Sequence, residues 1–442
     1  MTTLAAMPKY ENYKNSGVDW LGEIPSCWTL FRLKVTVNGC VNGLWGQDPK
    51  GEADIVVLRV ADFDRNKLNV SDDKLTYRAI PKKDLQSRIL KKGDLLLEKS
   101  GGGDKTLVGC VVLFDKNYKA VTSNFVAKMT PRQCFNSSFL NYAFACLYSN
   151  KINYLSIKQT TGIQNLDSDS YLNEQFAFPL IEAQTAISNY LDEKTDEIDK
   201  VIAIKEKQIG LLKERKQIII QKTVTQGLKP DVPMKDSGVD WIGQIPRHWE
   251  VLANRALFSE RVEHGREGLP LLSVSIHSGV SSEEISDEKN VRGRVKIEDK
   301  TKYILVKKGD VAFNMMRAWQ GGIGAVGTDG MVSPAYIVAK PKSTINAEYF
   351  EHQYRCPEFI QQMDRFSRGI TDFRKRLYWN EFKQLYTVKP PTQEQIEIVN
   401  YIKEQTEKLE SGIGLLNNQI EKLKEYKTTL INSAVTGKIK VA

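Results

Sequence analysis

Two long segments of the chain carry apolar residues at alternating steps of four and three positions. The first extends from about residue 182 to residue 226 and is bracketed by Pro179 and Pro230. The second, from residue 393 to residue 440, repeats the pattern with fewer polar interruptions. This spacing is the heptad seam of a coiled coil, so each segment predicts one long helix. With about 40 residues at a rise of ~1.5 Å, each helix would be about 60 Å long.

The polar interruptions of the seam fall at matching places in the two helices. Thr195 and Lys216 of the first segment correspond to Thr406 and Lys427 of the second. Polar residues in a seam cost stability but fix the register, which indicates that the two helices pair with each other. The alternative is that each helix packs only on its own domain. The predicted seam consists of Leu191, Ile198, Ile202, Ile209, Leu212 and Ile219, together with Ile402, Leu409, Ile413, Leu416, Ile420, Leu423 and Leu430.

A sequence motif of thirteen residues, which we call the repeated phrase, occurs twice in the chain. "SGVDWLGEIPSCW" at Ser16–Trp28 recurs as "SGVDWIGQIPRHW" at Ser237–Trp249, with nine identical positions. Each phrase is followed by a diverged block, at residues 29–178 and 250–391, and each block leads into one of the helical segments. A phrase that is nearly the same in both halves cannot distinguish two different ligands. We therefore expect its tryptophans and Ile-Pro turn to pack where each block meets the helices.

The sequences of the diverged blocks are typical of β-rich domains. Short β-branched runs such as "DIVVLRV" and "GCVVLF" are bounded by Gly and Asp turns. Both blocks contain Lys-Lys-Gly-Asp, at Lys91–Asp94 and Lys307–Asp310. The segment "TSNFVAK" at 122–128 is also similar to "VSPAYIVAK" at 332–340. These likenesses indicate that the two blocks share one fold.

The patterns together predict an α+β fold with two β-rich domains in tandem. Two long helices that form an antiparallel coiled coil separate the domains, and the duplication gives pseudo-two-fold symmetry. The predicted boundaries are 1–28 for the first repeat motif, 29–178 for the first variable domain, 179–229 for the central helix, 230–249 for the second repeat motif, 250–391 for the second variable domain and 392–442 for the C-terminal helix.

The charge distribution narrows the choice of partner. The formal net charge is +9, which favours nucleic acid first and an anionic membrane surface second. Residues 29–178 carry 21 basic and 15 acidic side chains, and residues 250–391 carry 22 and 18, whereas both helical segments are close to neutral. A polyanion would therefore meet the variable blocks first.

The sequence offers no secretion signal, membrane span or metal motif. No signal-peptide core opens the chain and no run approaches about 18 apolar residues, so we expect a cytoplasmic, prokaryotic protein. The six cysteines are dispersed and never form C-x-x-C, which argues against a disulfide framework and against a metal site.

Motifs for catalysis are missing as well. "SGGGDKT" at Ser100–Thr106 lacks the spacing of a nucleotide-binding loop and is better explained as a turn near a phosphate. We therefore expect no catalytic residue and no enzyme activity on this chain. Two alternatives stay open: a coiled-coil scaffold that binds proteins, and a DNA enzyme with a cryptic nuclease site.

Basic and amide side chains make the variable blocks candidates for DNA binding. Amides pair bidentately with adenine, and arginine suits both phosphate and guanine. The alternative for each of these residues is a solvated loop. The candidates are Lys99, Ser100, Lys158, Gln159, Gln164 and Asn165 in the first block and Asn314, Arg317, Trp319, Gln320, Arg365, Arg368, Arg374, Lys375 and Arg376 in the second.

With these features, the chain resembles the specificity subunit of a type I restriction-modification enzyme over essentially its whole length. The resemblance rests on the repeated phrase, the two Lys-Lys-Gly-Asp turns, "TGIQNL" at Thr161–Leu166, and the helical blocks that end in "VTQGLK" and "VTGKIK". The second block departs from the pattern, because it has "GITDFRKRL" at Gly369–Leu377 in place of "GIQNL".

The resemblance implies a division of labour between subunits. Two target-recognition domains would each recognise one half of a split, asymmetric DNA site, and the paired helices would hold two methyltransferase subunits. Restriction subunits with motor and nuclease activities would join this complex. S-adenosylmethionine, ATP and Mg²⁺ would belong to those partners, and this chain would carry no cofactor.

Overall fold

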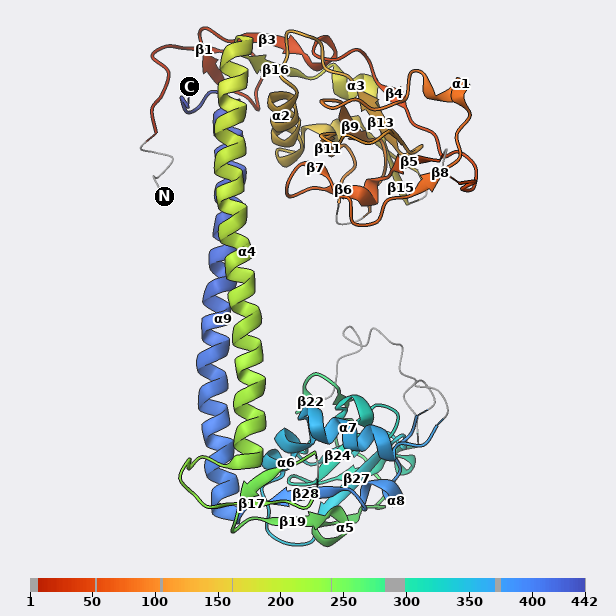
Figure 1. Cartoon of the computed structure of the whole chain (residues 1–442), viewed down its shortest axis with the longest axis vertical. Coiled ribbons are helices and arrows are strands. Elements are labelled where there is room, and N and C mark those ends of the chain that lie inside the picture. The colour runs from red at the N-terminus through yellow and green to blue at the C-terminus, as the bar shows by residue number, and fades with distance from the viewer. Residues whose placement is uncertain are drawn as a thin grey trace. The chain divides into compact units, whose positions relative to one another are not determined.

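The computed structural model divides the chain into two compact units (Figure 1). Unit 1 comprises residues 1–205 and 418–442, and unit 2 comprises residues 206–417. The α+β fold class expected from the sequence is confirmed, with short strands in each unit and two long helices. The structure describes residues 7–51, 54–103, 106–160, 162–239, 241–282, 299–369 and 375–441, so the predicted site residue Arg374 lies outside the described residues.

The two long helices are α4 (Ile181–Gln226) and α9 (Thr392–Val435), and each contributes one stretch to each unit. Within each unit, the stretch of α4 packs beside the stretch of α9 (Figure 1). Every predicted seam residue is buried or half-buried. The four-three spacing therefore identified the contact face of both helices.

Of the polar seam residues, the two lysines connect the helices. In unit 1, the Lys427 ammonium lies 2.7 Å from an Asp199 carboxylate oxygen and also donates to the Asn66 carbonyl. In unit 2, Lys216 lies 2.9 Å from a Glu410 oxygen. Both lysines thus reach across to the other helix. In each unit, residue numbers that rise along α4 meet numbers that fall along α9, so the pairing is antiparallel.

Unit 1 is built around a six-stranded sheet with the strand order β4-β13-β9-β11-β7-β6. Helix α2 packs on this sheet, and Phe139, Phe144 and Leu147 of α2 are fully buried in the main core. The elements are β1 (Tyr13–Asn15), β2 (Glu23–Pro25), β3 (Thr29–Arg32), β4 (Val41–Asn42), β5 (Ile55–Leu58), β6 (Phe63–Asp64), β7 (Asn69–Val70), β8 (Tyr77–Arg78), α1 (Lys82–Leu85), β9 (Leu95–Glu98), β10 (Ser100–Gly101), β11 (Val111–Leu113), β12 (Ala120–Thr122), β13 (Val126–Met129), α2 (Ser137–Ser149), β14 (Ile157–Thr160), β15 (Ile163–Leu166), α3 (Ser168–Leu172) and β16 (Gln175–Phe178).

Unit 2 has a four-stranded sheet with the order β20-β27-β24-β25, and helices α6 and α7 cover its core. Phe313 of β24 and Tyr349 of α6 are fully buried there. The elements are β17 (Met234–Asp236), β18 (Gln244–Pro246), β19 (Glu250–Ala253), α5 (Asn254–Leu257), β20 (Phe258–Glu260), β21 (Val274–Ser275), β22 (Gly279–Val280), β23 (Ile304–Val306), β24 (Val311–Asn314), β25 (Ile323–Ala325), β26 (Gly330–Val332), β27 (Tyr336–Pro341), α6 (Ala347–Tyr354), α7 (Pro357–Phe366), α8 (Trp379–Phe382) and β28 (Tyr386–Lys389).

The repeated phrase packs against the end of a long helix in both units. Trp28 is buried beside Gly437, just after α9, and Trp249 is buried beside Gly227, just after α4. Both glycines have positive φ, 71° for Gly437 and 77° for Gly227, as expected where a helix is terminated in the left-handed region. The packing role expected for the phrase is confirmed, because its closing tryptophans lie in the cores and not on an exposed face.

Candidate nucleic-acid interface

In unit 1, three of the predicted DNA-binding residues form one row across a small sheet. Strands β10, β15 and β14 pair so that Ser100, Asn165 and Lys158 are direct cross-strand neighbours. Directly opposite residues project from the same face of a sheet. The Ser100 hydroxyl donates to the Asn165 side-chain oxygen at 2.6 Å, and Asn165 and Lys158 are exposed. We call the β14–β15 pair the hairpin of unit 1.

Lys158 is held in place by a neighbouring carboxylate. Its ammonium lies 2.8 Å from Asp167, which also accepts from the backbone N–H of Ser170 at the start of α3. The hydrogen bond from Lys158, and then that from Ser170, hold the pKa of Asp167 below its ordinary value. Since 75% of the Lys158 side chain is exposed, the pair orders the lysine without covering it.

The two glutamines of the hairpin are not equivalent. Gln164 is buried, and its side chain donates to the Gly103 carbonyl at 3.2 Å and accepts from the Val108 N–H at 3.1 Å. Its amide is therefore committed to the loop that follows β10 and is not presented to a ligand. Gln159, opposite Gln164 on the outer strand, is exposed and retains the amide chemistry that the sequence analysis assigned to the pair.

Lys99 lies at a β-bulge beside this row. The backbone N–H groups of both Lys99 and Ser100 donate to the Phe125 carbonyl, at 2.8 Å and 3.2 Å. Two residues on one strand thus oppose one on the other, which is the defining feature of a bulge. The Lys99 ammonium donates to the Asn42 side-chain oxygen at 2.9 Å. Asn42 and Phe125, both exposed, were missed by the sequence analysis, because only tertiary contacts bring them beside Lys99.

Unit 2 contains the counterpart of the hairpin row. Arg368 and Arg376 form an antiparallel bridge with both N–H···O distances at 2.8 Å. The N–H of Leu377 donates to the Met315 carbonyl at 2.8 Å, as that of Leu166 donates to Lys99 at 2.7 Å. These matching bonds align Leu377 with Leu166, so Arg368 and Arg376 are equivalent to Lys158 and Asn165. The segment Gly369–Leu377, which departs from the "GIQNL" pattern, therefore supplies one member of the corresponding row, Arg376, and Arg368 directly precedes it.

A buried acid orients Arg368. Its guanidinium lies 2.5 Å from a Glu381 oxygen on α8, and the Glu381 side chain is only 7% exposed, whereas that of Arg368 is 74% exposed. A charge-assisted bond of this kind fixes the guanidinium while leaving its outer edge free. Glu381 was not among the sequence-based candidates, and it carries no local signal, since the contact is made between separate elements.

A second group of unit 2 candidates gathers around Trp319. The ammonium of Lys375 lies 5.3 Å from the centre of the Trp319 ring and 2.7 Å from Asp364. Arg317, which is exposed, donates to Gln320 at 2.7 Å. The structure thus brings these predicted residues from two loops to one surface.

The remaining described candidates of unit 2 are Asn314 and Arg365. Asn314 uses its side-chain oxygen to accept from the Met316 N–H at 2.9 Å, which stabilises a turn. Arg365 is exposed near the end of α7.

The matching Lys-Lys-Gly-Asp turns have a structural explanation. In each turn the Asp side chain accepts from the backbone N–H of the first Lys, for Asp94 at 2.7 Å and for Asp310 at 2.9 Å. Asp94 is also bound by the Thr130 hydroxyl, and Asp310 by the buried guanidinium of Arg261. The lysines stay on the surface.

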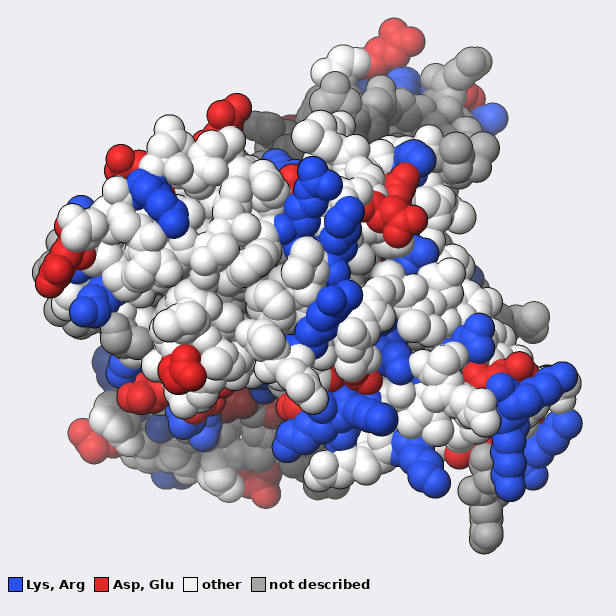
Figure 2. All heavy atoms as spheres, turned by 90° about the horizontal axis from the view of Figure 1, so that it is seen from above, with Lys and Arg blue, Asp and Glu red and all other residues white. Residues whose placement is uncertain are grey.

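In the view of Figure 2, a row of Lys and Arg side chains crosses the middle of the face, and acidic side chains lie beside this row and toward the edge.

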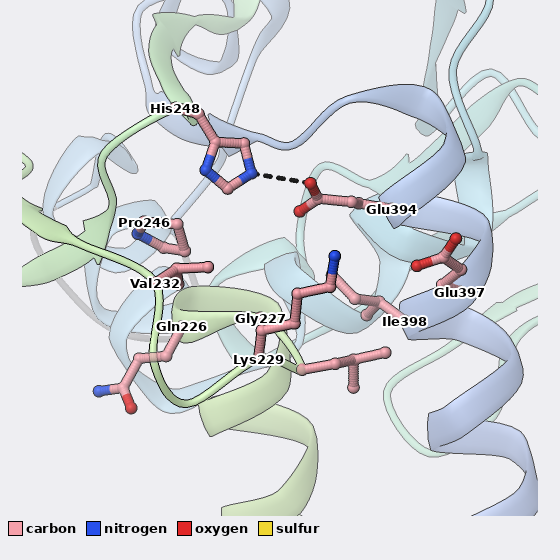
Figure 3. A pocket seen from close by; sticks show the side chains of 10 residues that line it. Gln226, Gly227, Lys229, Val232, Pro246, His248, Glu394, Glu397 and Ile398 are labelled. Atoms are coloured by element: carbon pink, nitrogen blue, oxygen red, sulfur yellow. Dashed lines mark hydrogen bonds and ion pairs between the residues drawn. The ribbon is translucent and has the colours of Figure 1, made fainter.

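A small pocket in unit 2 lies where the repeated phrase meets the helix ends (Figure 3). One oxygen of Glu394 lies 2.7 Å from His248 Nε2, and the other accepts from Trp249 Nε1 at 2.8 Å. Figure 3 shows the contact between His248 and Glu394, with Gly227 and Ile398 below it. Through these two contacts, Glu394 of α9 connects the helix to the repeated phrase.

Neither a metal site nor a membrane helix emerges from the described part of the chain. Among the residues that the structure describes, no three His, Cys, Asp or Glu side chains gather as a metal-binding group. Within the same residues, no helix is long and apolar enough to cross a membrane.

Each unit therefore combines an α+β domain, a row of basic or amide side chains that are exposed or half-buried, and a stretch of paired helix. The rows are equivalent in position and different in residue identity, Lys and Asn in unit 1 and two Arg in unit 2. The two units are therefore duplicated and diverged copies of one scaffold, with different basic or amide side chains at equivalent positions.

Comparison with known proteins shows which proteins share this sequence pattern and fold. Over its whole length the chain is 21% identical to the whole of a curated Methanocaldococcus jannaschii protein that is named as the MjaX specificity subunit of a type I restriction enzyme. A solved structure of a type I restriction-modification system matches with a TM-score of 0.63 and 14% identity, covering 93% of this chain and 98% of the other. The crystal structure of the HsdS subunit from Thermoanaerobacter tengcongensis matches with a TM-score of 0.51 and 14% identity, covering 94% and 98%.

No family model matches the chain. The whole-length matches nevertheless agree with one another, and they confirm the resemblance that the repeated segments indicated. The chain has the fold of type I restriction-modification specificity subunits.

Proposed function

We propose that this chain is the DNA-recognition subunit of a type I restriction-modification complex and that it binds an asymmetric, bipartite DNA site. The observation that carries the proposal is the pair of equivalent rows, Lys158 and Asn165 in unit 1 and Arg368 and Arg376 in unit 2. Side chains at one position of a shared scaffold that differ in hydrogen-bonding pattern favour different bases. Each unit would then recognise its own half-site.

The proposal includes partner subunits that supply the chemistry. Methyltransferase subunits would bring S-adenosylmethionine and methylate adenine, and restriction subunits would bring ATP, Mg²⁺ and cleavage. The paired helices offer a docking surface of suitable character: Leu211, Ile218 and Leu415 of unit 2 are more than half exposed although they are large and apolar. The antiparallel register brings Leu415 level with Leu211. Exposed apolar groups of this kind are typical of protein interfaces.

The first test determines the recognised sequence. Single-molecule sequencing of a host genome, or of a host supplied with this chain and its methyltransferase partner, maps the methylated adenines. We expect one motif made of two different short half-sites at a constant separation. A continuous motif, or a methylation pattern that is unchanged when the chain is deleted, would contradict the proposal.

The second test measures binding to a duplex that contains the mapped site. Neutralising about six phosphates makes affinity fall about a thousandfold as salt rises from about 50 mM to about 200 mM. We expect a steep loss of this kind, together with a weaker but equally salt-dependent affinity for a scrambled duplex. A protein-binding scaffold would show neither the salt dependence nor the preference for the site.

A further inference from the structure

Phe125 of unit 1 is an exposed residue beside the row formed by Ser100, Asn165 and Lys158. It sits in the turn between β12 and β13, and 54% of its surface is exposed. Its carbonyl accepts from both residues of the bulge, so Phe125 lies directly across from Lys99 and Ser100. Through Ser100, Phe125 therefore adjoins the row that continues with Asn165 and Lys158.

The loop that carries Phe125 is held firmly. Gly43 donates to the Val126 carbonyl at 3.2 Å, and Leu44 donates to the Thr122 carbonyl at 2.8 Å. A Cβ atom on Gly43 would lie 2.1 Å from the Thr122 oxygen, so this close approach requires glycine. An exposed ring on a loop fixed in this way loses little conformational freedom when it binds.

The surroundings of the ring are basic. Lys99 is bound by the neutral amide of Asn42, so its positive charge is not cancelled by a carboxylate. Arg88 donates to the Asn42 carbonyl at 3.1 Å, which adds a second cation beside the same residue. Glu98, one residue before the bulge, is buried and paired with Arg65. Two cations, Lys99 and Arg88, therefore lie at this edge of the unit, and they attract phosphate, which favours DNA over an apolar protein partner.

Unit 2 lacks this aromatic group. The N–H of Met315 donates to the Ala335 carbonyl at 3.2 Å, just as the N–H of Lys99 donates to the Phe125 carbonyl in unit 1. Ala335 therefore occupies the position of Phe125. A function of the ring would be specific to unit 1 and is not part of the shared scaffold.

We propose that Phe125 is a base-contacting residue of unit 1 and that its ring makes an apolar contact with the DNA bases of one half-site. The inference rests on the proposed function. Apolar side chains contact DNA either at a thymine methyl group or as wedges that unstack a base step. Both contacts use the same exposed ring, and the experiment separates them.

The test compares the full-length chain with Phe125→Ala, Phe125→Leu and the control Tyr386→Ala. Tyr386 is an exposed aromatic residue of β28 in unit 2, with 48% of its surface exposed. Binding to the mapped duplex is measured at fixed salt, permanganate reactivity reports unstacked thymines, and replacement of thymine by uracil removes the methyl groups of one half-site at a time. Thermal unfolding confirms that each variant is folded.

We expect Phe125→Ala to weaken binding by about tenfold or more, Phe125→Leu to weaken it less, and Tyr386→Ala to leave it unchanged. Permanganate-reactive thymines that disappear in Phe125→Ala identify a wedge. A loss caused by uracil in the wild type, and absent in Phe125→Ala, identifies a methyl contact. If Phe125→Ala binds and footprints like the wild type, the inference is overturned while the proposed function stands. If the wild type shows no preference for the mapped duplex, the proposed function fails.

Discussion

At the scale of single residues, the cations of the candidate interface differ in which side chain orients them. Arg368 is fixed by the buried acid Glu381, and Lys158 by Asp167, whereas Lys99 is held by an uncharged amide. A carboxylate that orients a cation also competes with DNA phosphate for it. We therefore expect the paired cations to contribute geometry as well as charge, and Lys99 to contribute charge.

Glu381→Gln tests the orienting role at Arg368. The substitution keeps the shape and one acceptor but removes the charge, so Arg368 should become less well ordered. We expect a loss of discrimination at one base position in the half-site of unit 2, worth about 1–3 kcal/mol for a bidentate contact. Selection of bound duplexes from a library randomised at both half-sites measures this.

The matched variant is Asp167→Asn, which should alter the half-site of unit 1 and leave that of unit 2 intact. Relaxed preference in both half-sites after either substitution would argue for a general loss of stability.

At the scale of elements, the helix pair is specified by a seam with two lysines in it. Lys427 is 11% exposed at its side chain and contacts Asp199, and Lys216 contacts Glu410 and is 26% exposed. An apolar residue at these places would allow several registers. Since each lysine has its acid on the other helix, one register of the pair is favoured over its neighbours.

Lys427→Ala should lower the free energy of unfolding by about 1–2 kcal/mol, because it leaves Asp199 without its partner in a half-buried place. The control Lys422→Ala removes an exposed pair with Glu425 and should change it by less than about 0.5 kcal/mol. Urea unfolding followed by circular dichroism compares the two. Equal effects would mean that Lys427 does not contribute to the register.

At the scale of the whole molecule, both units share the two long helices. Helix α4 begins in unit 1 and ends in unit 2, and α9 does the reverse, so the C-terminal residues 418–442 complete unit 1. The Lys440 N–H donates to the Pro8 carbonyl at 2.7 Å, and the Tyr13 hydroxyl donates to the Gly437 carbonyl at 3.0 Å. The two chain ends therefore belong to one packed unit.

If the helices set the separation of the half-sites, lengthening them should lengthen the gap. Insertion of one heptad into α4 within Val201–Ile220, with a matching heptad in α9, preserves the seam and adds about 10 Å of helix. At about 3.4 Å per base pair, the gap should grow by about three base pairs while both half-sites stay the same. Mapping of methylated adenines reads the result directly. An unchanged gap would show that the helices do not act as the spacer.

The sequence by itself determined the long helices, their seam and the repeated architecture, because periodic spacing and literal repetition are local properties of the chain. The candidates chosen by residue type also included all five members of the two rows. Only the tertiary structure decided that Gln164 is buried, that Arg376 is equivalent to Asn165, and that Glu381 and Phe125 lie beside the rows. The physical reason is that burial, cross-strand register and the bulge at Lys99 depend on strands distant in sequence, whose pairing leaves no periodic trace in either strand alone.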